Sequence, residues 1–242
     1  MGLIPSFTVL MDIYDVLYLS YLVPEERLRP TVPDTVGFAA RSEGRTILSL
    51  VLFHSRNVRA SFLPFLRFSY DQANIRTYVL DPLGAPAVFF LKSGITSRLV
   101  SLATGILGIP WQPISMRIEA MPGSGPLREY TAEGRFEGDF RIRLTVDSEP
   151  ASGMALFRTP EEAVRFLTGP TTGFYGLSGG LVRFEVEHSP ISPAMGRLSA
   201  IECPALVNSG LLTDEELRIP HSALIARHGR FKVSMPPARV SL

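Results

Sequence analysis

Residues 70–116 read YDQANIRTYVLDPLGAPAVFFLKSGITSRLVSLATGILGIPWQPISM, and the predicted fold is organised around this stretch. It holds an alternating segment, a Pro/Gly turn, an apolar segment, a segment with helical spacing and the start of a further strand. This order predicts two neighbouring strands, a helix and a third strand. The few polar side chains are spaced within apolar surroundings, a pattern that indicates the wall of a pocket.

Side chains alternate between the two faces of a strand, and residues 73–79 divide on that basis. One face carries an amide, a guanidinium and a phenol, from Asn74, Arg76 and Tyr78. The neighbouring segment, residues 87–91, is apolar on both faces, as in a strand covered on both sides. If its partner is covered too, the polar face lines an enclosed space, where a guanidinium needs an anionic or hydrogen-bonding partner. The alternative is that these three side chains face water.

After Lys92 the apolar residues follow a helical period. They recur at Ile95, Leu99, Leu102 and Ile106. Ser97 or its neighbour is suited to cap the start, and Gly108 with the proline two residues later ends the segment. We therefore predict a helix with an apolar stripe over about residues 95–106. Trp111, the only tryptophan, opens the next strand.

Elsewhere the sequence predicts mainly strands, separated by turns that the 20 glycines and 20 prolines supply. The predicted strands cover residues 7–23, 36–41, 45–54, 115–121, 127–136, 140–147, 181–188 and 197–206. Two S/T-x-x-E capping boxes, beginning at Thr159 and Thr213, predict short helices. The arginine-rich, aromatic connection at residues 57–68 is a candidate flap over the pocket. No break in composition divides residues 1–242, so we expect one domain, with a loosely held Pro-rich tail at 231–242.

Composition and charge exclude several classes of protein. The formal net charge of +1 offers no general attraction to nucleic acid, and the single cysteine, Cys203, cannot form an internal disulfide. The apolar run Phe7–Val23 contains Asp12 and Asp15 and falls short of the ~20 apolar residues that a membrane span requires. No secretion signal is recognisable. We therefore expect a cytoplasmic protein without nucleic-acid or membrane partners, while a homo-oligomer stays open.

Candidate catalytic and metal-binding motifs are few. Residues 176–180 match G-x-S-x-G around Ser178, but a strand follows the motif where a nucleophile elbow needs a helix, so we interpret it as a turn. The four histidines lack metal-ligand spacing, and we expect no metal. His188 lies on the apolar face of its strand, either as a hydrogen-bonded core residue or as an acid/base in the pocket.

Lys92 and the aromatic residues near it also permit two interpretations. Lys92 is either a lysine at the rim of the sheet, with its ammonium group in water, or a charge near Arg76. In the second case its amine could form a Schiff base. Phe90 and Trp111 are either pocket walls or plain core.

Several of these segments together resemble a known family. NIRTYV at residues 74–79, AVFFLK at 87–92, the apolar helix and GIPWQPISM at 108–116 carry the resemblance, together with VPEERLRP and FEVEHSP. They are similar to the uncharacterised bacterial family domain of unknown function 2071, over about residues 5–215, and that family is similar in fold to acetoacetate decarboxylase. The resemblance implies a mainly β (α+β) domain with an antiparallel curled sheet. This sheet would form a barrel or cone around an internal pocket, flanked by a few helices.

The resemblance also bears on chemistry. Acetoacetate decarboxylase carries a Schiff-base lysine in a G-x-P-K-K segment, and the matching residues here are 108–112, with Trp111 and Gln112 at the lysine positions. Since an indole cannot form an imine, decarboxylation by that route is not expected. The acid that the family commonly carries before its N-x-R strand corresponds here to Gln72, preceded by Asp71.

Three functions remain in competition. The first is a protein that binds a small acidic or carbonyl-bearing molecule without a cofactor. Its predicted ligand-binding residues are Asn74, Arg76, Tyr78, Phe90, Trp111 and His188. The second is a lyase or hydrolase in the same pocket, with His188, Tyr78 or Lys92 as the catalytic candidates. The third is a structural or interaction protein without a pocket, which an ion pair of Arg76 with Asp71 or Glu119 would favour.

Overall fold

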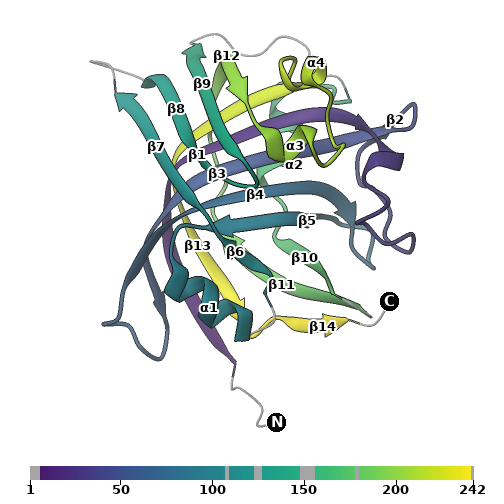
Figure 1. The fold of residues 1–242 in the computed structure, drawn as a ribbon. Coiled ribbons are helices and arrows are strands. Elements are labelled where there is room, and N and C mark those ends of the chain that lie inside the picture. The colour runs from purple at the N-terminus through teal and green to yellow at the C-terminus, as the bar shows by residue number, and fades with distance from the viewer. Residues whose placement is uncertain (1–5, 107–108, 123–126, 148–155, 178–179, 241–242) are drawn as a thin grey trace.

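The computed structural model describes residues 6–106, 109–122, 127–147, 156–177 and 180–240, most of them in strands (Figure 1). The strands are β1 (Phe7–Pro24), β2 (Arg41–Ser42), β3 (Arg45–Ala60), β4 (Phe68–Leu80), β5 (Pro86–Ile95), β6 (Trp111–Pro113), β7 (Ser115–Pro122), β8 (Leu127–Arg135), β9 (Asp139–Asp147), β10 (Thr172–Leu177), β11 (Gly180–His188), β12 (Ala194–Glu202), β13 (Ser222–Met235) and β14 (Ala238–Val240). The helices are η1 (Glu25–Arg27, 3-10), α1 (Arg98–Ile106), α2 (Pro160–Thr168), α3 (Pro204–Val207) and α4 (Asp214–Leu217).

A closed ring of strands forms the centre of the molecule. The order β11-β10-β5-β4-β3-β1-β13 returns to its start because β11 also pairs with β13, at Val186 with Val233 and His188 with Phe231. We call these seven strands the barrel. The strand order confirms the predicted curled, mainly β architecture and makes the inside of the ring the natural place for a pocket.

The sheet is mixed rather than wholly antiparallel, which corrects the prediction. Most neighbours are antiparallel, but β10 runs parallel to β5 through Gly173–Tyr175, and β6 also runs parallel to β5. The cause is the long connection between β5 and β10, which contains α1, the β7–β9 strands and α2. A chain that leaves a strand and returns beside it through such a crossover arrives in the same direction.

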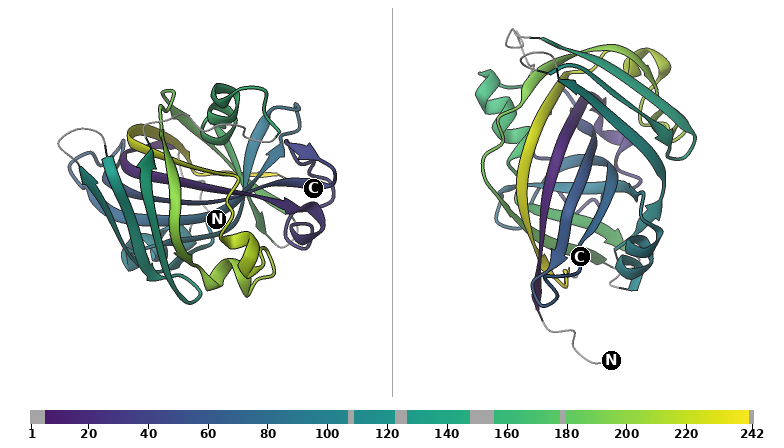
Figure 2. Two further views of the ribbon diagram at one scale, coloured as in Figure 1. Left: turned by 90° about the horizontal axis from the view of Figure 1, so that it is seen from above. Right: turned by 90° about the vertical axis from the view of Figure 1, so that its left-hand side faces the viewer.

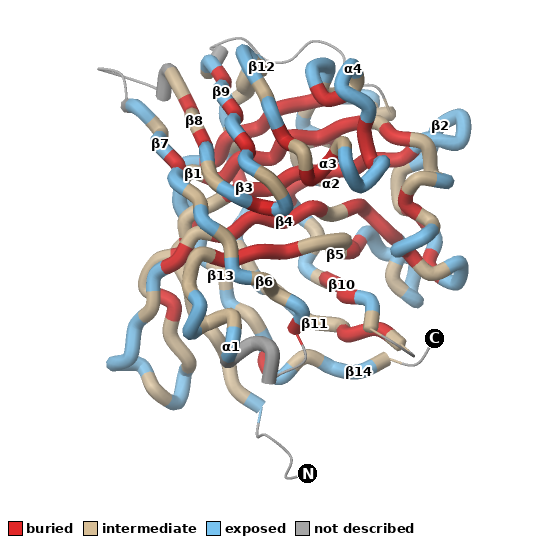
Figure 3. The backbone as a smooth tube through the Cα atoms, in the orientation of Figure 1, coloured by how far each residue is buried: buried red, intermediate tan, exposed pale blue. Residues whose placement is uncertain are grey.

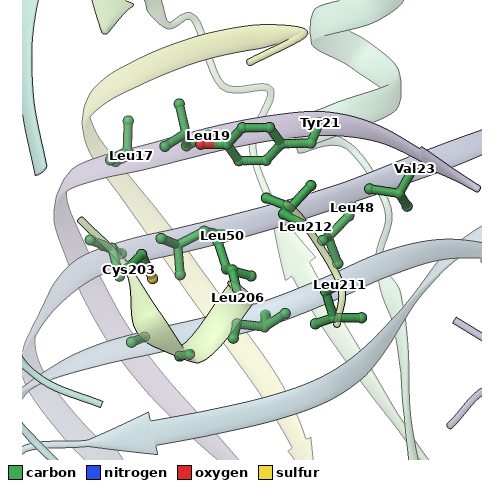
Figure 4. Packing of buried hydrophobic residues seen from close by; sticks show 14 of the residues in the cluster. Leu17, Leu19, Tyr21, Val23, Leu48, Leu50, Cys203, Leu206, Leu211 and Leu212 are labelled. Atoms are coloured by element: carbon green, nitrogen blue, oxygen red, sulfur yellow. The ribbon is translucent and has the colours of Figure 1, made fainter. Parts of the chain in front are cut away.

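The outer face of the barrel is covered by a second layer. Strands β7, β8, β9 and β12 continue from the first half of β13, and α3 and α4 lie beside them (Figures 1 and 2). Figure 4 shows Leu206, Leu211 and Leu212 packed over Leu48 and Leu50. Tyr21 belongs to the same cluster, and its hydroxyl donates to the carbonyl of Leu217 (2.9 Å). This apolar layer contains most of the fully buried leucines and stabilises the sheet.

Helix α2 covers the other side of the sheet, as the right-hand view of Figure 2 shows. Its start has the predicted cap and proline but not the reciprocal half of the capping box: the Thr159 hydroxyl accepts the backbone N–H of Glu162, while the Glu162 carboxylate accepts the N–H of Arg158. Ala163 and Leu167 are buried in a cluster with Tyr78. Helix α2 therefore covers part of the barrel interior, next to the polar face of β4.

Several local predictions are confirmed and several are wrong. The hairpin of β8 and β9 and the capping box at Thr213 are present. The predicted strand 36–41 is wrong: only a single bridge joins Phe38 to Val79 before the short β2. The predicted connection at 57–68 begins inside β3, which continues to Ala60. Residues 231–240, predicted to be loosely held, lie largely in β13 and β14.

Helix α1 differs most from its prediction. Leu99 and Leu102, expected on an apolar stripe, are 64% and 69% exposed, whereas Val100 packs against the sheet. Ile95, expected to begin the helix, is the last residue of β5 and fully buried. Within the described ranges, no helix is both long and apolar enough to cross a membrane.

Candidate functional site

A cavity of about 310 Å³ lies inside the barrel. Along β4 it is lined by every second residue, namely Phe68, Tyr70, Gln72, Asn74 and Arg76, because alternate side chains of a strand share a face. The other walls come from β1, β3, β5, β11 and β13 and are mostly apolar. Their aliphatic and aromatic side chains include Met11, Val51, Val88, Phe184, Val186 and Val233. The cavity is thus a largely apolar chamber whose main polar stripe runs along β4, with Arg59, Thr171 and Thr172 as further polar lining residues.

Arg76 is a cation in this chamber. Its Nη2 donates to the carbonyl of Leu167 (2.8 Å) and to the hydroxyl of Tyr78 (3.3 Å). Its Nε is buried without a hydrogen-bond partner, and in the described part of the chain no carboxylate lies within ion-pair distance of the guanidinium. The guanidinium also lies 5.4 Å from the ring centroids of Tyr18 and Tyr78. Arg76 therefore keeps hydrogen-bonding capacity and an uncompensated charge.

The partner of Arg76 on the protein is the end of a helix. Leu167 is the penultimate residue of α2, and the last carbonyls of a helix have no partner within it. They also carry the negative end of the helix dipole, which favours a nearby cation. This contact fixes the direction of the guanidinium but supplies only partial charge, so an anion entering the cavity would find Arg76 in place.

The carboxylates that could have neutralised Arg76 are engaged elsewhere. Asp71, on the opposite face of β4, contacts His54 Nδ1 (2.6 Å) and accepts from Arg56 Nη1 (3.0 Å). Burial raises the pKa of Asp71, but His54 and Arg56 outweigh this effect and lower it overall. Glu119 pairs with Arg117. The ion pair that would have favoured a protein without a pocket is therefore not formed.

Two amides continue the polar stripe away from Arg76. Gln72 Nε2 donates to Asn74 Oδ1 (3.0 Å), and both residues are buried. This contact leaves the amide N–H groups of Asn74 and the side-chain carbonyl of Gln72 for other partners. A ligand held by Arg76 could thus meet a further donor and an acceptor along β4.

An aromatic wall begins beside the stripe, where Phe90 of β5 pairs across the sheet with Arg76. Phe90 stacks on Tyr175 with ring centroids 4.8 Å apart, and Phe184 lies 5.5 Å from both rings. Gly173 makes room for this group, since a Cβ there would approach Phe184 to 2.7 Å. Trp111 is held by a hydrogen bond from its Nε1 to the Tyr175 hydroxyl (2.5 Å), which in turn donates to Ser93 Oγ (2.8 Å). The wall is therefore fixed by packing and by hydrogen bonds.

The titratable groups around the cavity are arginines and tyrosines. Burial raises the pKa of Tyr18 and of Tyr70 to about 12, and it also raises the pKa of Tyr175. These phenols stay neutral near pH 7. Among the described residues that line the cavity there is no Asp, Glu, His, Lys or Cys. The cavity thus offers hydrogen bonds and positive charge, but no group that exchanges a proton readily at neutral pH.

Four predicted site residues line the cavity: Asn74, Arg76, Phe90 and Trp111. Tyr78 shares their face but lies beneath α2, fully buried, where its hydroxyl donates to Leu167 (3.0 Å). His188 does not line the cavity. It ends β11, where its Nδ1 donates to the carbonyl of Ser189 (2.9 Å) and its ring stacks on Phe231.

Lys92 lies away from Arg76. It forms an ion pair with Glu137 in the β8–β9 turn, at a second hollow of about 490 Å³ that Ser93 and Gln112 also line. A bulge in the β4–β5 pairing, between Ile75 and Arg76, shifts the register beside Lys92. The amine is therefore neutralised by Glu137 and does not line the cavity.

Sequence reasoning missed several cavity residues. Gln72 continues the alternation of Asn74 and Arg76, so the period alone could have identified it. Tyr18 and Tyr175 come from β1 and β10, and no local pattern indicates that these strands meet β4. Ser178 lies outside the described residues. Within the ranges that the structure describes, no group of three or more His, Cys, Asp or Glu side chains could hold a metal ion.

The family model of DUF2071, described as an uncharacterized conserved protein, matches residues 11–228. The chain belongs to the DUF2071 family. This match includes the polar stripe of β4 and the aromatic wall, and it confirms the resemblance seen in the sequence. No curated protein matches this DUF2071 chain.

Solved structures resemble the DUF2071 chain in fold. One is an acetoacetate decarboxylase-like enzyme from Sphingomonas wittichii RW1, with a TM-score of 0.62, 14% identity, and coverage of 96% of this chain and 93% of the other. Another is the enduracididine biosynthesis enzyme MppR with HEPES buffer bound (TM-score 0.60, 14% identity, coverage 99% and 89%). MppR complexed with pyruvate gives a TM-score of 0.58 at 14% identity, with coverage of 100% and 92%. These likenesses establish the acetoacetate decarboxylase-like fold.

Proposed function

We propose that this protein binds a small molecule with an acidic or carbonyl head and an apolar body, and that Arg76 anchors the head. One observation carries the proposal: the part-buried Arg76 guanidinium, without a carboxylate partner in the described chain, borders a largely apolar cavity inside the barrel. Burying such a charge is costly unless it is paired and hydrogen-bonded. A ligand carboxylate or carbonyl oxygen would complete what Leu167 and Tyr78 only partly supply.

The other walls suit the rest of the ligand. Asn74 and Gln72 offer a donor and an acceptor next to the head, while Phe90, Tyr175 and Trp111 present ring faces to the body. A cavity of about 310 Å³ lies at the lower end of the range for small-molecule sites. The fold offers a precedent, since MppR has been seen complexed with pyruvate, a small carbonyl acid.

Binding without chemistry fits the lining better than catalysis does. Acid/base catalysis needs a group whose pKa lies near the working pH, and the cavity tyrosines are displaced in the opposite direction. His188 and Lys92, two of the three catalytic candidates, do not line the cavity. An enzyme on the same pocket remains the alternative because the solved neighbours of this fold are enzymes.

The test uses Trp111, the only tryptophan and a cavity residue, as a fluorescent reporter. Straight-chain carboxylic and keto acids are titrated against alcohols of the same length. We expect the acids to change Trp111 emission at lower concentration than the alcohols. Arg76→Gln should weaken acid binding by about 10- to 150-fold, because hydrogen bonds to charged groups contribute roughly 1.5–3 kcal/mol, and should leave the alcohols unaffected.

A matched control separates the ligand role of Arg76 from its contact with α2. Tyr78→Phe removes the second hydrogen bond to Leu167 and the long contact from Arg76 Nη2 (3.3 Å), but it keeps the guanidinium and the bond from Arg76 to Leu167 (2.8 Å), so acid affinity should stay within about threefold. Equal affinity for acids and alcohols in the wild-type protein would refute the anchor. Recovery of a chemically altered acid by mass spectrometry would establish the enzymatic alternative instead.

A further inference from the structure

Large apolar side chains gather, exposed, at one end of the cavity. Phe62, Phe65 and Leu66 belong to the β3–β4 connection and are 67%, 81% and 44% exposed, while Leu99 and Leu102 of α1 are 64% and 69% exposed. Figures 1 and 2 place α1 and this connection at the same end of the barrel, and Figure 3 shows exposed positions along both. We call residues 59–68 and 98–102 the rim. Soluble surfaces rarely concentrate apolar side chains in this way without a partner.

The two halves of the rim belong to one structure. Phe68 and Val100 pack into the same small cluster. Arg59 from the first half and Leu99 from the second both line the cavity. Because Leu99 is at once a lining residue and largely exposed, the cavity meets solvent at the rim.

The tip of the rim is held in place by backbone hydrogen bonds. Leu63 N–H donates to the carbonyl of Ala60 (3.0 Å), and Leu66 N–H donates to the carbonyl of Leu63 (3.1 Å). Ser61 N–H donates to the carbonyl of Thr8 on β1 (2.7 Å), while Thr8 N–H donates to Ser61 Oγ (3.1 Å). An ordered turn that is bonded to β1 therefore holds both phenylalanines at the surface, Phe65 largely exposed and Phe62 with its ring edge-to-face against Phe7 (5.0 Å).

The charge of the rim selects the kind of partner. Its two sequences, RASFLPFLRF and RLVSL, contain three arginines and no Asp or Glu. Arg67 and Arg98 are exposed, and neither they nor Arg59 has an ion-pair partner among the residues that the structure describes. In a two-fold pairing of identical copies these like charges would face each other, which is unfavourable. An anionic surface with an apolar interior complements both properties.

We propose that the rim docks on an anionic lipid surface. Phe62 and Phe65 enter the boundary between headgroups and acyl chains, and Arg67 and Arg98 contact the lipid phosphates. The cavity opening then faces the acyl region, so a ligand with an apolar body passes between bilayer and cavity without crossing water. The expectation of no membrane partner rested on the absence of an apolar span and on the net charge of the whole chain, and this proposal departs from it because the rim is a local patch that is both apolar and positively charged.

The test is sedimentation of the full chain with vesicles. Phosphatidylcholine vesicles serve as the neutral probe, and vesicles that also contain phosphatidylglycerol serve as the anionic one. We expect the wild-type protein to bind only the anionic vesicles, with affinity that falls as salt screens the arginines. The double variant Phe65→Ser/Leu102→Ser should bind at least tenfold more weakly, and so should Arg67→Gln/Arg98→Gln.

Leu83→Ser is the matched control, since Leu83 is 90% exposed on the β4–β5 turn and lies outside the rim. It should leave vesicle binding unchanged. The proposal fails if the wild-type protein does not sediment with anionic vesicles, or if Leu83→Ser weakens binding as much as the rim variants do. It also fails if light scattering shows a dimer that Phe65→Ser/Leu102→Ser dissociates. None of these readouts involves Arg76, so they do not depend on the proposed ligand.

Discussion

The two faces of β4 treat polar groups in opposite ways. On the outer face, the Asp71 carboxylate contacts His54 and Arg56, and the residues beyond it, Ala73 and Ile75, are buried in the core cluster under the second layer. On the inner face, Arg76, Asn74 and Gln72 keep unused donors and acceptors beside a cavity. The outer face of β4 thus contributes to the stability of the fold, and its inner face provides groups that can bind a ligand. The difference locates the site: satisfied polar groups stabilise the fold, and unsatisfied ones await a ligand.

The sharpest way to break this comparison is to truncate an apolar side chain on each face. Ile75 is fully buried on the outer face, whereas Val186 is half-buried and borders the cavity. We expect Ile75→Ala to lower the free energy of unfolding in urea by about 2–5 kcal/mol. Val186→Ala should cost about 1 kcal/mol or less, because its side chain already lacks neighbours on one side. Equal costs would mean that the cavity is collapsed in solution.

Alkaline unfolding tests whether the inner face is shut away from water. Burial raises the pKa of Tyr18 and Tyr70 from 10.0 to about 12, so the unfolded chain loses these protons at lower pH than the folded one. The contribution of these two phenols to stability should therefore be constant below about pH 10 and be lost as the pH rises through about 12, by roughly 3 kcal/mol for each phenol. Tyr70→Phe should lose less stability over that interval. If wild type and variant lose the same amount, Tyr70 is hydrated in the folded protein.

Asp71 gives the corresponding test of the outer face at acid pH. Its pKa is lowered below 3.8 because His54 and Arg56 outweigh burial, so its contribution is present above about pH 4 and lost as the pH falls through the folded-state pKa. Asp71→Asn should lower the free energy of unfolding by about 1–3 kcal/mol at neutral pH. The variant should also lose less stability than the wild type as the pH falls below about 4. Asp139→Asn, at a largely exposed ion pair, should cost less than about 0.5 kcal/mol. Asp71→Asn should leave ligand affinity unchanged, and a large drop would break the separation of the two faces.

Several residues of the inner face could be predicted from the sequence because short, local sequence patterns identify them. The alternation at Asn74 and Arg76 placed both side chains on one face, and the two-sided apolar character of residues 87–91 indicated that this face is enclosed. Phe90 and Trp111 followed from the same stretch. The capping boxes at Thr159 and Thr213 predicted helix starts because a cap depends on only four residues.

The rest depends on contacts that a local pattern does not encode. His188 lies on the apolar side of its strand, yet it sits at the end of β11 where the barrel closes against Phe231. For Lys92 the sequence left two interpretations open, the rim of the sheet or a place near Arg76. The bulge beside it and the approach of Glu137 put it at another hollow, away from Arg76. Leu99 and Leu102 repeat at helical spacing, but the stripe they form faces solvent. The spacing of apolar residues along the sequence indicates which face of a helix or strand is apolar. What that face contacts is determined only by the folded protein.

The smallest predicted effect concerns the helix that holds Arg76 in place. Thr159 caps α2 by accepting the N–H of Glu162 (3.2 Å), and Thr213 caps α4 on the outer side in the same way (3.2 Å to Glu216). Each Thr→Ala change should cost about 1 kcal/mol of stability. Only Thr159→Ala should also weaken acid binding, by about two- to fivefold, since a frayed α2 positions the Leu167 carbonyl less well.

This pair isolates positioning from stability because both variants lose the same kind of hydrogen bond. The measurement is acid titration by Trp111 emission beside urea unfolding of each variant. If Thr159→Ala and Thr213→Ala lose the same affinity for acids, the loss comes from reduced global stability and not from the position of α2. Unchanged affinity in Thr159→Ala would mean that Arg76 holds its direction without the helix, and the guanidinium would then owe its placement to Tyr78 and to the strand itself.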